Sequence, residues 1–269
     1  MRPLSATLRY ACLPFSSVSI SSHHISVLAY HRVSGMTDSD FDLLPEQFDE
    51  QIDYLKQNTH VVGPSVLGKG LDFRWTESTP ATILTFDDAY IDFYDTVFPR
   101  LCSSDLVATL FIPAGCIEEP ARGREAFSAP LCTWSQLREM IKSGHVIPAS
   151  HGYSHRSCFH LSPAQQEYDL EMSRQLIEDR LDSPVRDFAW PFGHWNDRAL
   201  EVARRFYPRV WGFQGGVIDS DLSAGAVLPR IPIRKQDSLD WFLRKLSGSA
   251  ALEDRVRSQL ANLRAKAGL

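Results

Sequence analysis

The chain has 269 residues, of which 43% are hydrophobic, so it is long enough to bury a sizeable core in one large domain. Its 28 Lys and Arg residues against 33 Asp and Glu residues give a net charge of -5, which argues against a nucleic-acid partner. The 5 cysteines show no Cys-x-x-Cys spacing, which disfavours a disulfide framework or thiolate zinc site, and no apolar run reaches the roughly 20 residues of a transmembrane helix.

Residues 1–24 are rich in serine and lack periodicity, and we expect a loose leader there. Basic residues occur in it, but Arg9, Pro14 and several serines interrupt any apolar signal-peptide core. Together with the cysteine usage, this predicts a cytoplasmic protein; membrane association through the substrate and export both stay open. The fold is expected to begin at Ile25 with the buried strand "ISVLAYHRV", which delivers His31 near its end.

Helical and strand patterns alternate after this first strand. Helices are expected over residues 45–58, 90–101, 133–144, 162–181, 196–206 and 239–246, and strands over residues 81–86, 108–113, 145–150, 187–190, 209–213 and 228–233. A long loop is expected over residues 116–132. The alternation predicts parallel β/α units in a barrel or open sheet, as one domain over residues 25–250, followed by a solvated helix over residues 251–269.

Side chains that can bind metals or transfer protons cluster at the ends of these strands. In parallel β/α folds the chemistry sits at the carboxyl ends of the strands, where the following loops converge. The residues found there are His31, Asp87, Asp88, His151, His155, Pro191 and Phe192, with Arg230 inside the last strand. We therefore expect these residues to form one site.

Asp87 and Asp88 follow the apolar strand "ATILTF". An isolated Asp pair commonly caps a helix, because a carboxylate accepts hydrogen bonds from the first N–H groups of the helix. Capping needs one carboxylate, however, and the second would repel the first unless a cation intervenes. A metal ion would resolve this conflict.

His151 and His155 are four residues apart in "SHGYSH", so on a helical turn both imidazoles would point the same way. Two histidines and one carboxylate form a common catalytic metal set that leaves positions for water and substrate. Zn²⁺ fits this set best, with Co²⁺, Ni²⁺ and Mn²⁺ as alternatives. The other carboxylate could then take a proton from a water whose pKa the ion lowers toward about 7. These residues imply metal-assisted hydrolysis of an amide or ester, with the proton donor still unassigned.

In this order and spacing, "TFDDAY", "SHGYSH" and "FAWPFG" resemble the first three motifs of the polysaccharide deacetylases, the NodB-homology or carbohydrate esterase 4 family. The segments "VLAYHRV", "LLPEQFDEQIDYLKQN", "LCTWSQLREMIKSGH" and "LPRIPI" are similar to the branch that contains bacterial exopolysaccharide de-N-acetylases. The resemblance covers about residues 26–248. It implies an α/β fold, a distorted (β/α)₇ barrel related to the TIM barrel. It also implies removal of N-acetyl groups from N-acetylglucosamine-like sugars, with release of acetate.

Carried over residue by residue, the resemblance implies that Asp87 is the general base. The implied metal ligands are Asp88, His151 and His155. The Pro191-Phe192-Gly193 turn resembles the motif whose backbone N–H, at the aromatic position, helps to hold the oxyanion.

The family's C-terminal Leu-x-His motif is missing, because no histidine follows His194. In the branch that this chain resembles, the motif is permuted to the N-terminus, which is where His31 lies. The resemblance therefore implies that His31 is the proton donor to the departing amine. Taken alone, the histidine would be interpreted as a packed or capping imidazole.

The sequence departs from the family pattern at three positions, and "GHVIPASH" also has one residue more than the usual spacing and lacks its glutamate, which bears on how His151 is presented. Ala89 replaces the usual glycine after the Asp pair, which matters only if the turn needs a positive φ. Gly152 replaces a hydroxyl residue, so a supporting hydrogen bond could be lost. Ala189 stands where many members have Arg, and Arg230 is the candidate to orient Asp87 instead, although such an arginine more often forms a surface ion pair.

The sequence gives less information about the substrate than about the site residues. Trp134, Trp190 and Trp195 are candidates for stacking on sugar rings, although aromatic residues in such elements more often belong to the core. The leading hypothesis is a carbohydrate de-N-acetylase acting on an N-acetylated glycan or a lipid-linked saccharide. An O-acetyl esterase, a deformylase or another amidohydrolase on the same scaffold stays open, as does a non-catalytic glycan-binding module. The sequence does not predict the oligomeric state.

Overall fold

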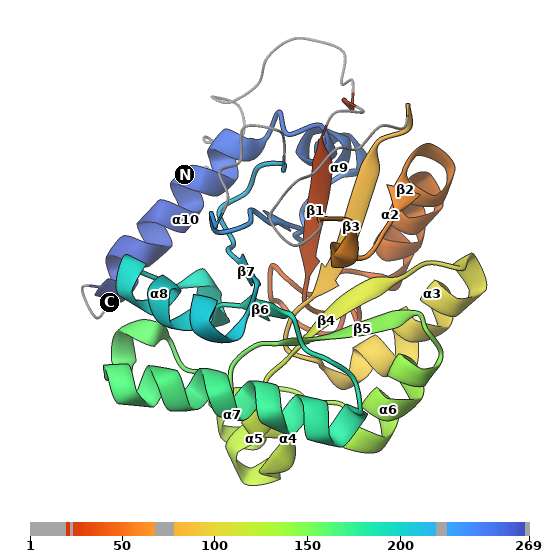
Figure 1. Cartoon of the computed structure of the whole chain (residues 1–269). Coiled ribbons are helices and arrows are strands. Elements are labelled where there is room, and N and C mark those ends of the chain that lie inside the picture. Colours follow the sequence, from red (N-terminus) through yellow and green to blue (C-terminus); the bar gives the residue numbers. More distant parts are fainter. Residues whose placement is uncertain (1–19, 22–23, 68–77, 219–224, 267–269) are drawn as a thin grey trace.

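The computed structural model describes residues 20–21, 24–67, 78–218 and 225–266 (Figure 1), so most of the predicted leader lies outside the described residues. The sheet is parallel, in the order β7-β6-β5-β4-β3-β1-β8, and β2 also pairs with β3. Its strands are β1 (Ile25–Tyr30), β2 (His60–Val61), β3 (Ala81–Phe86), β4 (Ala108–Ile112), β5 (Val146–Ser150), β6 (Asp187–Ala189), β7 (Arg209–Trp211) and β8 (Ile231–Pro232). The predicted parallel β/α arrangement is confirmed.

The last strand segment connects the two ends of the sheet. Leu228 forms a parallel bridge with Trp211 at the end of β7, and β8 then pairs with Leu28 and Ala29 of β1. The predicted strand over residues 228–233 is therefore shorter than expected, because the segment changes partners part-way. This change of partners curls the sheet into a distorted barrel, as the resemblance implied.

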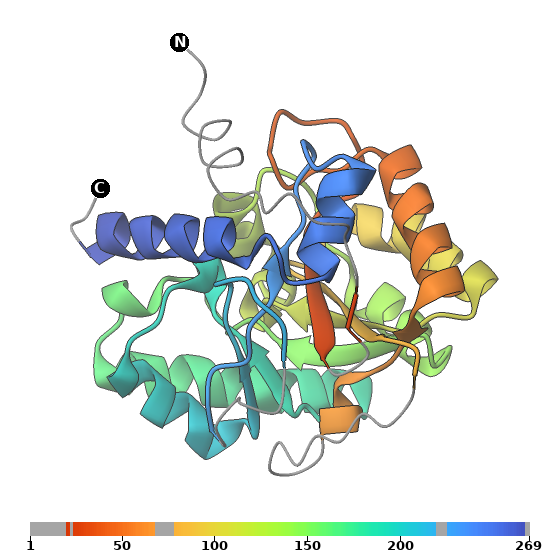
Figure 2. The ribbon, with the colours of Figure 1, turned by 90° about the horizontal axis from the view of Figure 1, so that it is seen from above.

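Helices surround the curled sheet (Figures 1 and 2). They are α2 (Pro45–Asn58), α3 (Phe98–Ser104), α4 (Ala114–Glu118), α5 (Pro120–Ala126), α6 (Trp134–Lys142), α7 (Pro163–Leu181), α8 (Asp197–Phe206), α9 (Leu239–Leu246) and α10 (Ala251–Lys266). Local capping explains two of the starts: the Thr133 side chain accepts a hydrogen bond from Gln136 N–H, and Ser162 accepts one from Gln165 N–H. These caps fix where α6 and α7 begin.

The segment predicted as a long loop over residues 116–132 is instead mostly helical, since it holds the end of α4 and all of α5. These helices have 5 and 7 residues, too few for a hydrophobic period to repeat. The predicted helix over residues 90–101 also differs, because a π-helical stretch (Phe93–Val97) precedes α3. Pro99 has no N–H to offer the regular helical ladder there.

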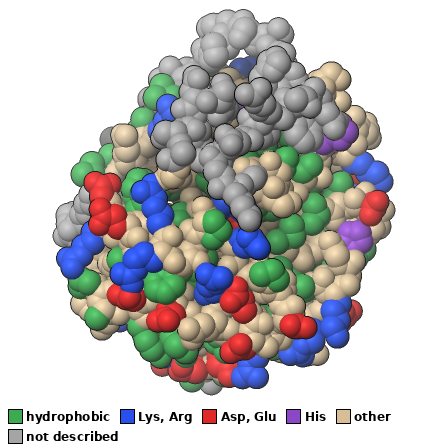
Figure 3. Space-filling view, in the orientation of Figure 1, with side chains coloured by type: hydrophobic (Ala, Val, Ile, Leu, Met, Phe, Trp, Pro, Cys, Tyr) green, Lys and Arg blue, Asp and Glu red, His purple; other side chains and the backbone are tan. Residues whose placement is uncertain are grey.

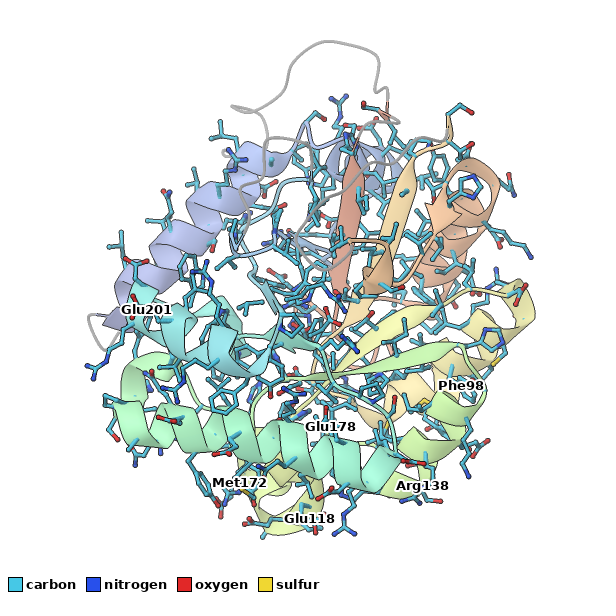
Figure 4. The ribbon with its side chains drawn as sticks, viewed as in Figure 1. Phe98, Glu118, Arg138, Met172, Glu178 and Glu201 are labelled. Atoms are coloured by element: carbon cyan, nitrogen blue, oxygen red, sulfur yellow. The ribbon has the colours of Figure 1, made fainter. Side chains whose placement is uncertain are left out.

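Contacts between α4, α6 and α7 hold one flank of the barrel together. Arg138 of α6 donates to the carbonyl oxygen of Arg180 in α7 at 2.8 Å, and Trp134 Nε1 donates to Glu118 of α4 at 2.9 Å; Figure 4 labels Arg138 and Glu118. Trp134 is thus engaged in helix packing.

The charge distribution and the helix lengths bear on which partners the chain could bind. On the face shown in Figure 3, the acidic and basic side chains of the described residues are interspersed. Among the described helices, none is both long and apolar enough to cross a membrane.

Candidate active site

Strand alternation delivers three of the predicted residues to the barrel interior. Ile25 and Val27 of β1, Ala81 and Ile83 of β3, and Ala149 of β5 belong to one buried cluster with Phe111 and Trp211. Because side chains alternate with a period of two residues, His31, Asp87 and His151 continue these inward-facing rows just past the strand ends. Asp87 N–H also donates to the Tyr30 carbonyl oxygen at 2.9 Å, which extends the pairing of β1 and β3.

Asp87 forms a buried, two-pronged ion pair with Arg230. Arg230 Nη1 lies 2.5 Å from Asp87 Oδ1, and Nη2 lies 2.9 Å from Oδ2. Burial would raise the pKa of Asp87, but the guanidinium charge of Arg230, with the facing histidines His151 and His31, outweighs burial and lowers the pKa. Asp87 is therefore ionised at neutral pH.

Arg230 is itself fixed in place. The residue is fully buried, its Nε donates to the Gly212 carbonyl oxygen at 3.0 Å, and its guanidinium lies 4.8 Å from the centre of the Phe111 ring. The alternative of a surface ion pair is wrong for this residue. The guanidinium reaches Asp87 from the residue just before β8, whereas the family's usual arginine position, on β6, is occupied by Ala189.

The chain turns sharply after Asp87, so the two neighbouring carboxylates face different partners. Asp88 has φ of 76° and Ala89 has φ of 54°, both in the left-handed region. The turn therefore does need the positive φ for which glycine is the usual residue. The following helix begins at Ile91, so neither carboxylate occupies its N-cap position, and the capping alternative is wrong.

His151 presents a lone pair to the site. Its Nδ1 lies 2.9 Å from the carbonyl oxygen of Ala189, and because a carbonyl can only accept, Nδ1 carries the proton. Burial lowers the pKa of His151 to about 4, against the opposing effect of Asp87 and Asp88, so the ring is neutral at pH 7. Its Nε2 is then unprotonated, as a metal ligand must be.

His155 reaches the same point by a different route from the one predicted. His151 and His155 do not share a helical turn, because Gly152 has φ of 79° and His155 has φ of 51°. The loop after β5 folds back instead. It places Nε2 of His151 3.4 Å and Nε2 of His155 3.1 Å from Asp88 Oδ1. The expected convergence is found, with a loop in place of the helix.

Asp88, His151 and His155 fit a divalent metal ion. One ligand atom from each lies within 4.8 Å of the others, and all three residues are buried. Among the described residues, Asp88 Oδ1 has no hydrogen-bond donor of suitable geometry. Burial would raise the pKa of Asp88, but contact with His155 outweighs burial and keeps the pKa well below its usual range. A buried ionised carboxylate beside two imidazole nitrogens is a donor set suited to Zn²⁺.

His31 stands on the Asp87 side of the site. Its Nε2 lies 3.9 Å from Asp87 Oδ2, and its ring stacks on Phe41 with centroids 4.7 Å apart. Phe213 packs edge-on against the same ring at 5.6 Å. These two aromatic rings fix the orientation of the imidazole. The imidazole also lines the cavity described next.

These residues open into one cavity of about 590 Å³, within the roughly 300–1,000 Å³ of small-ligand sites. His31, Asp87, Asp88, His151, His155 and Phe192 all line it. Its walls include residues that sequence reasoning missed, namely Phe41, Phe213, Arg234, Asp254 and Arg257. Phe41 lies outside the strands and helices, so periodicity gave no signal for it. Phe213 is the last residue of the strand predicted over residues 209–213, but the observed strand β7 ends at Trp211. Asp254 and Arg257 belong to α10, which the sequence presented as a solvated helix.

The Pro191-Phe192 turn lies at the rim of this cavity. Phe192 has φ of 61°, is 58% exposed and places its ring 4.9 Å from that of His155. Trp190, by contrast, is 3% exposed and packs edge-on against Phe188 at 4.7 Å, so its position is that of a core residue. It is not among the residues that line the cavity.

Comparison with known proteins identifies the family of the chain. A family model described as polysaccharide deacetylase matches residues 76–211, about half of the chain. The chain belongs to this family. The matched region contains Asp87, Asp88, His151 and His155, whereas His31 and Arg230 lie outside it.

Individual relatives are distant. A putative polysaccharide deacetylase of Bacillus subtilis, YxkH, is 24% identical over 194 residues, 72% of this chain and 63% of the relative. The poly-β-1,6-N-acetyl-D-glucosamine N-deacetylase of Escherichia coli is 26% identical over 202 residues, 62% of this chain and 30% of the relative. The chain thus spans less than two thirds of either one. The solved structure of IcaB from Ammonifex degensii shares the fold, with a TM-score of 0.71, 23% identity and coverage of 86% of this chain and 99% of that one.

Proposed function

We propose that this deacetylase-family chain is a metal-dependent hydrolase that removes N-acetyl groups from N-acetylhexosamine-containing glycans and releases acetate. One observation carries the proposal. The two adjacent carboxylates face different partners, because Asp87 is held ionised by Arg230 and Asp88 faces two imidazole nitrogens. The name of the Escherichia coli relative supports an N-acetylated glucosamine polymer as the substrate class.

Asp88, His151 and His155 would hold the ion, for which Zn²⁺ is the best fit. A bound divalent ion supplies Lewis-acid polarisation of the acetyl carbonyl and lowers the pKa of water toward about 7. The Nδ1 hydrogen bond from His151 to the Ala189 carbonyl fixes the tautomer that this role needs.

Asp87 would act as the general base. Its carboxylate is ionised, lies beside Asp88 and faces the cavity, so it can accept a proton from the attacking water. Both of its oxygens contact Arg230, which fixes the carboxylate plane while leaving further lone pairs for the water.

His31 would donate the proton that the departing amine nitrogen needs. Its ring lines the cavity, and its Nε2 is 3.9 Å from Asp87 Oδ2, so the proposed donor and the proposed base stand close together in the cavity. The carbon–nitrogen bond of the amide breaks as this proton arrives. The backbone N–H of Phe192 in the rim turn is the proposed donor to the oxyanion.

An O-acetyl esterase would use the same residues, so the test must compare the two bonds directly. Purified protein loaded with Zn²⁺ is incubated with N-acetylated and with O-acetylated glucosamine oligosaccharides, and released acetate is measured. We expect release from the N-acetylated substrate, and its loss in Asp87→Asn. Release from the O-acetylated substrate alone would refute the amide specificity. Absence of release from either, across several glycans and metals, would favour a glycan-binding protein.

A further inference from the structure

The loop that carries His155, residues 151–155 (the His loop), is anchored on one side by a single carboxylate from α7. Asp169 Oδ2 accepts a hydrogen bond from Tyr153 N–H at 3.0 Å, and Oδ1 accepts one from Ser154 N–H at 2.8 Å. The Asp169 side chain is buried, at 8% exposure. Two adjacent backbone amides immediately before His155 are therefore fixed by one side chain.

The other side of the His loop is anchored by the first residues of α4. Ala114 N–H donates to the Gly152 carbonyl at 3.1 Å, and Gly115 N–H donates to the Tyr153 carbonyl at 2.9 Å. Gly115 has no room for a side chain, since a Cβ there would lie 2.5 Å from the Tyr153 carbonyl oxygen. The loop is thus held between α4, which donates, and Asp169, which accepts.

Gly152 makes the approach of Asp169 possible. A Cβ built at Gly152 would lie 2.6 Å from Asp169 Oδ2, closer than real Cβ contacts come. The hydroxyl residue that the family usually has at this position therefore cannot coexist with the carboxylate of Asp169 in its present place. Gly152 thus leaves the space that the carboxylate of Asp169 occupies beside the loop.

We propose that Asp169 is a positioning residue for the metal site, acting through the backbone of Tyr153 and Ser154, and that Gly152 is required to admit it. The inference rests on the proposed function, because it concerns the ligand His155. His155 holds a left-handed φ of 51°, which is unfavourable for a residue with a side chain. Without the two anchoring bonds, the loop is free to relax and to move His155 Nε2 away from Asp88.

A purely structural role for Asp169 makes a different prediction. Loss of a buried acceptor would then lower the thermal stability of the metal-free protein and leave the Zn²⁺ affinity of the folded protein unchanged. A positioning role changes the affinity itself. The Zn²⁺ dissociation constant of folded protein therefore separates the two roles without any need for turnover.

The first experiment measures Zn²⁺ affinity by competition with a chromophoric chelator. We expect Asp169→Ala to weaken Zn²⁺ binding about 10- to 100-fold, the range typical of residues that orient metal ligands. Asp169→Asn should weaken it less, because its amide oxygen still accepts a hydrogen bond from one of the two N–H groups. Asp179→Asn is the matched control, since Asp179 is exposed on the same helix, and it should leave the affinity unchanged.

The second experiment places a methyl group at Gly152. Gly152→Ala is compared with Gly144→Ala, because Gly144 has a similar φ of 83° but open space where its Cβ would lie. Both variants carry the backbone strain of a left-handed alanine, and only the one at position 152 meets the carboxylate. We expect Gly152→Ala to weaken Zn²⁺ binding about 10-fold and Gly144→Ala to leave it unchanged. In an Asp169→Ala background, Gly152→Ala should add little.

The outcomes distinguish this inference from the function on which it rests. Folded Asp169→Ala with the parent's Zn²⁺ affinity would overturn the positioning role, as would equal Zn²⁺ affinities for the two glycine variants. If Asp169→Ala fails to fold, Asp169→Asn and the glycine pair still decide the question. Failure of the parent itself to bind Zn²⁺ would instead overturn the metal-dependent function, and the inference with it.

Discussion

Asp87 and Asp88 are neighbours in the chain, yet their buried charges are balanced in opposite ways. Asp87 has a permanent cation, Arg230, at 2.5 and 2.9 Å from its two oxygens. Asp88 has two imidazole nitrogens at 3.1 and 3.4 Å, and the ring of His151 is neutral at pH 7. The first carboxylate is therefore paired with a permanent cation, whereas the second faces imidazole nitrogens, which can themselves bind a metal ion.

This difference assigns separate tasks to identical side chains. A buried charge without a partner is strongly destabilising, so Asp87 can stay ionised inside the barrel only because Arg230 accompanies it. A carboxylate already paired with a guanidinium is a poor metal ligand, but it remains a proton acceptor. Asp88 lacks such a pair, and it is the one that the loop histidines surround.

Exchanging each carboxylate for its amide is the strongest test of this division. We expect Asp87→Asn to lower the rate of acetate release about 10³-fold, because a general base is lost, while Zn²⁺ content stays at the parent level. Asp88→Asn should instead lose Zn²⁺. Metal analysis of both purified variants checks the pair, and equal metal loss in the two would contradict the division.

Of the substitutions considered, removal of Arg230, the cation paired with Asp87, should lower the free energy of unfolding most. Arg230→Met leaves a fully buried carboxylate without its partner, and we expect a loss of about 3–5 kcal/mol in the free energy of unfolding, measured by urea denaturation. Arg244→Met is the control, since the partner of Arg244, Asp240, is 70% exposed, and it should change stability by about 0–0.5 kcal/mol. Similar losses in the two variants would show that Arg230 is not compensating a buried charge.

Removing the imidazole of His31 should lower the rate of acetate release without changing the proposed metal ligands. We expect His31→Ala to lower acetate release about 10²-fold, since the leaving amine loses its proton donor, with Zn²⁺ content and thermal unfolding close to those of the parent. Acetate release and metal content are measured on the same preparation. Retained activity would make His31 a packing residue of the Phe41 and Phe213 cluster.

The smallest effect is expected at the turn that separates the two carboxylates. Ala89 has φ of 54°, so Ala89→Gly should raise the free energy of unfolding by about 0.5–1 kcal/mol by relieving backbone strain. Ala164→Gly, in the first turn of α7, should shift it the other way by about 0.5–1 kcal/mol, because the backbone there is helical. Urea denaturation of both variants gives the change in the free energy of unfolding. If Ala89→Gly also lowers this free energy, the backbone at Ala89 is unstrained.

Sequence reasoning identified the ligand-rich positions because they follow strands. His31, Asp87 and His151 directly follow β1, β3 and β5, and short apolar runs of strand length are visible in a sequence. The helical relation between His151 and His155 was wrong, because the left-handed backbone at His155 depends on contacts with α4 and α7. Those contacts come from residues distant in the chain.

What the sequence by itself determined is the parallel β/α order, the strand ends and the family motifs, all of which are local patterns of apolar and polar residues. Only the tertiary structure decided which charged residues pair with each other. Arg230 and Asp87 are 143 residues apart, and they pair because the last strand segment closes the sheet onto β1. Asp169 reaches the His loop for the same kind of reason, through the packing of α7 against β5. Burial and charge compensation depend on distances in space, and a linear pattern does not contain those distances.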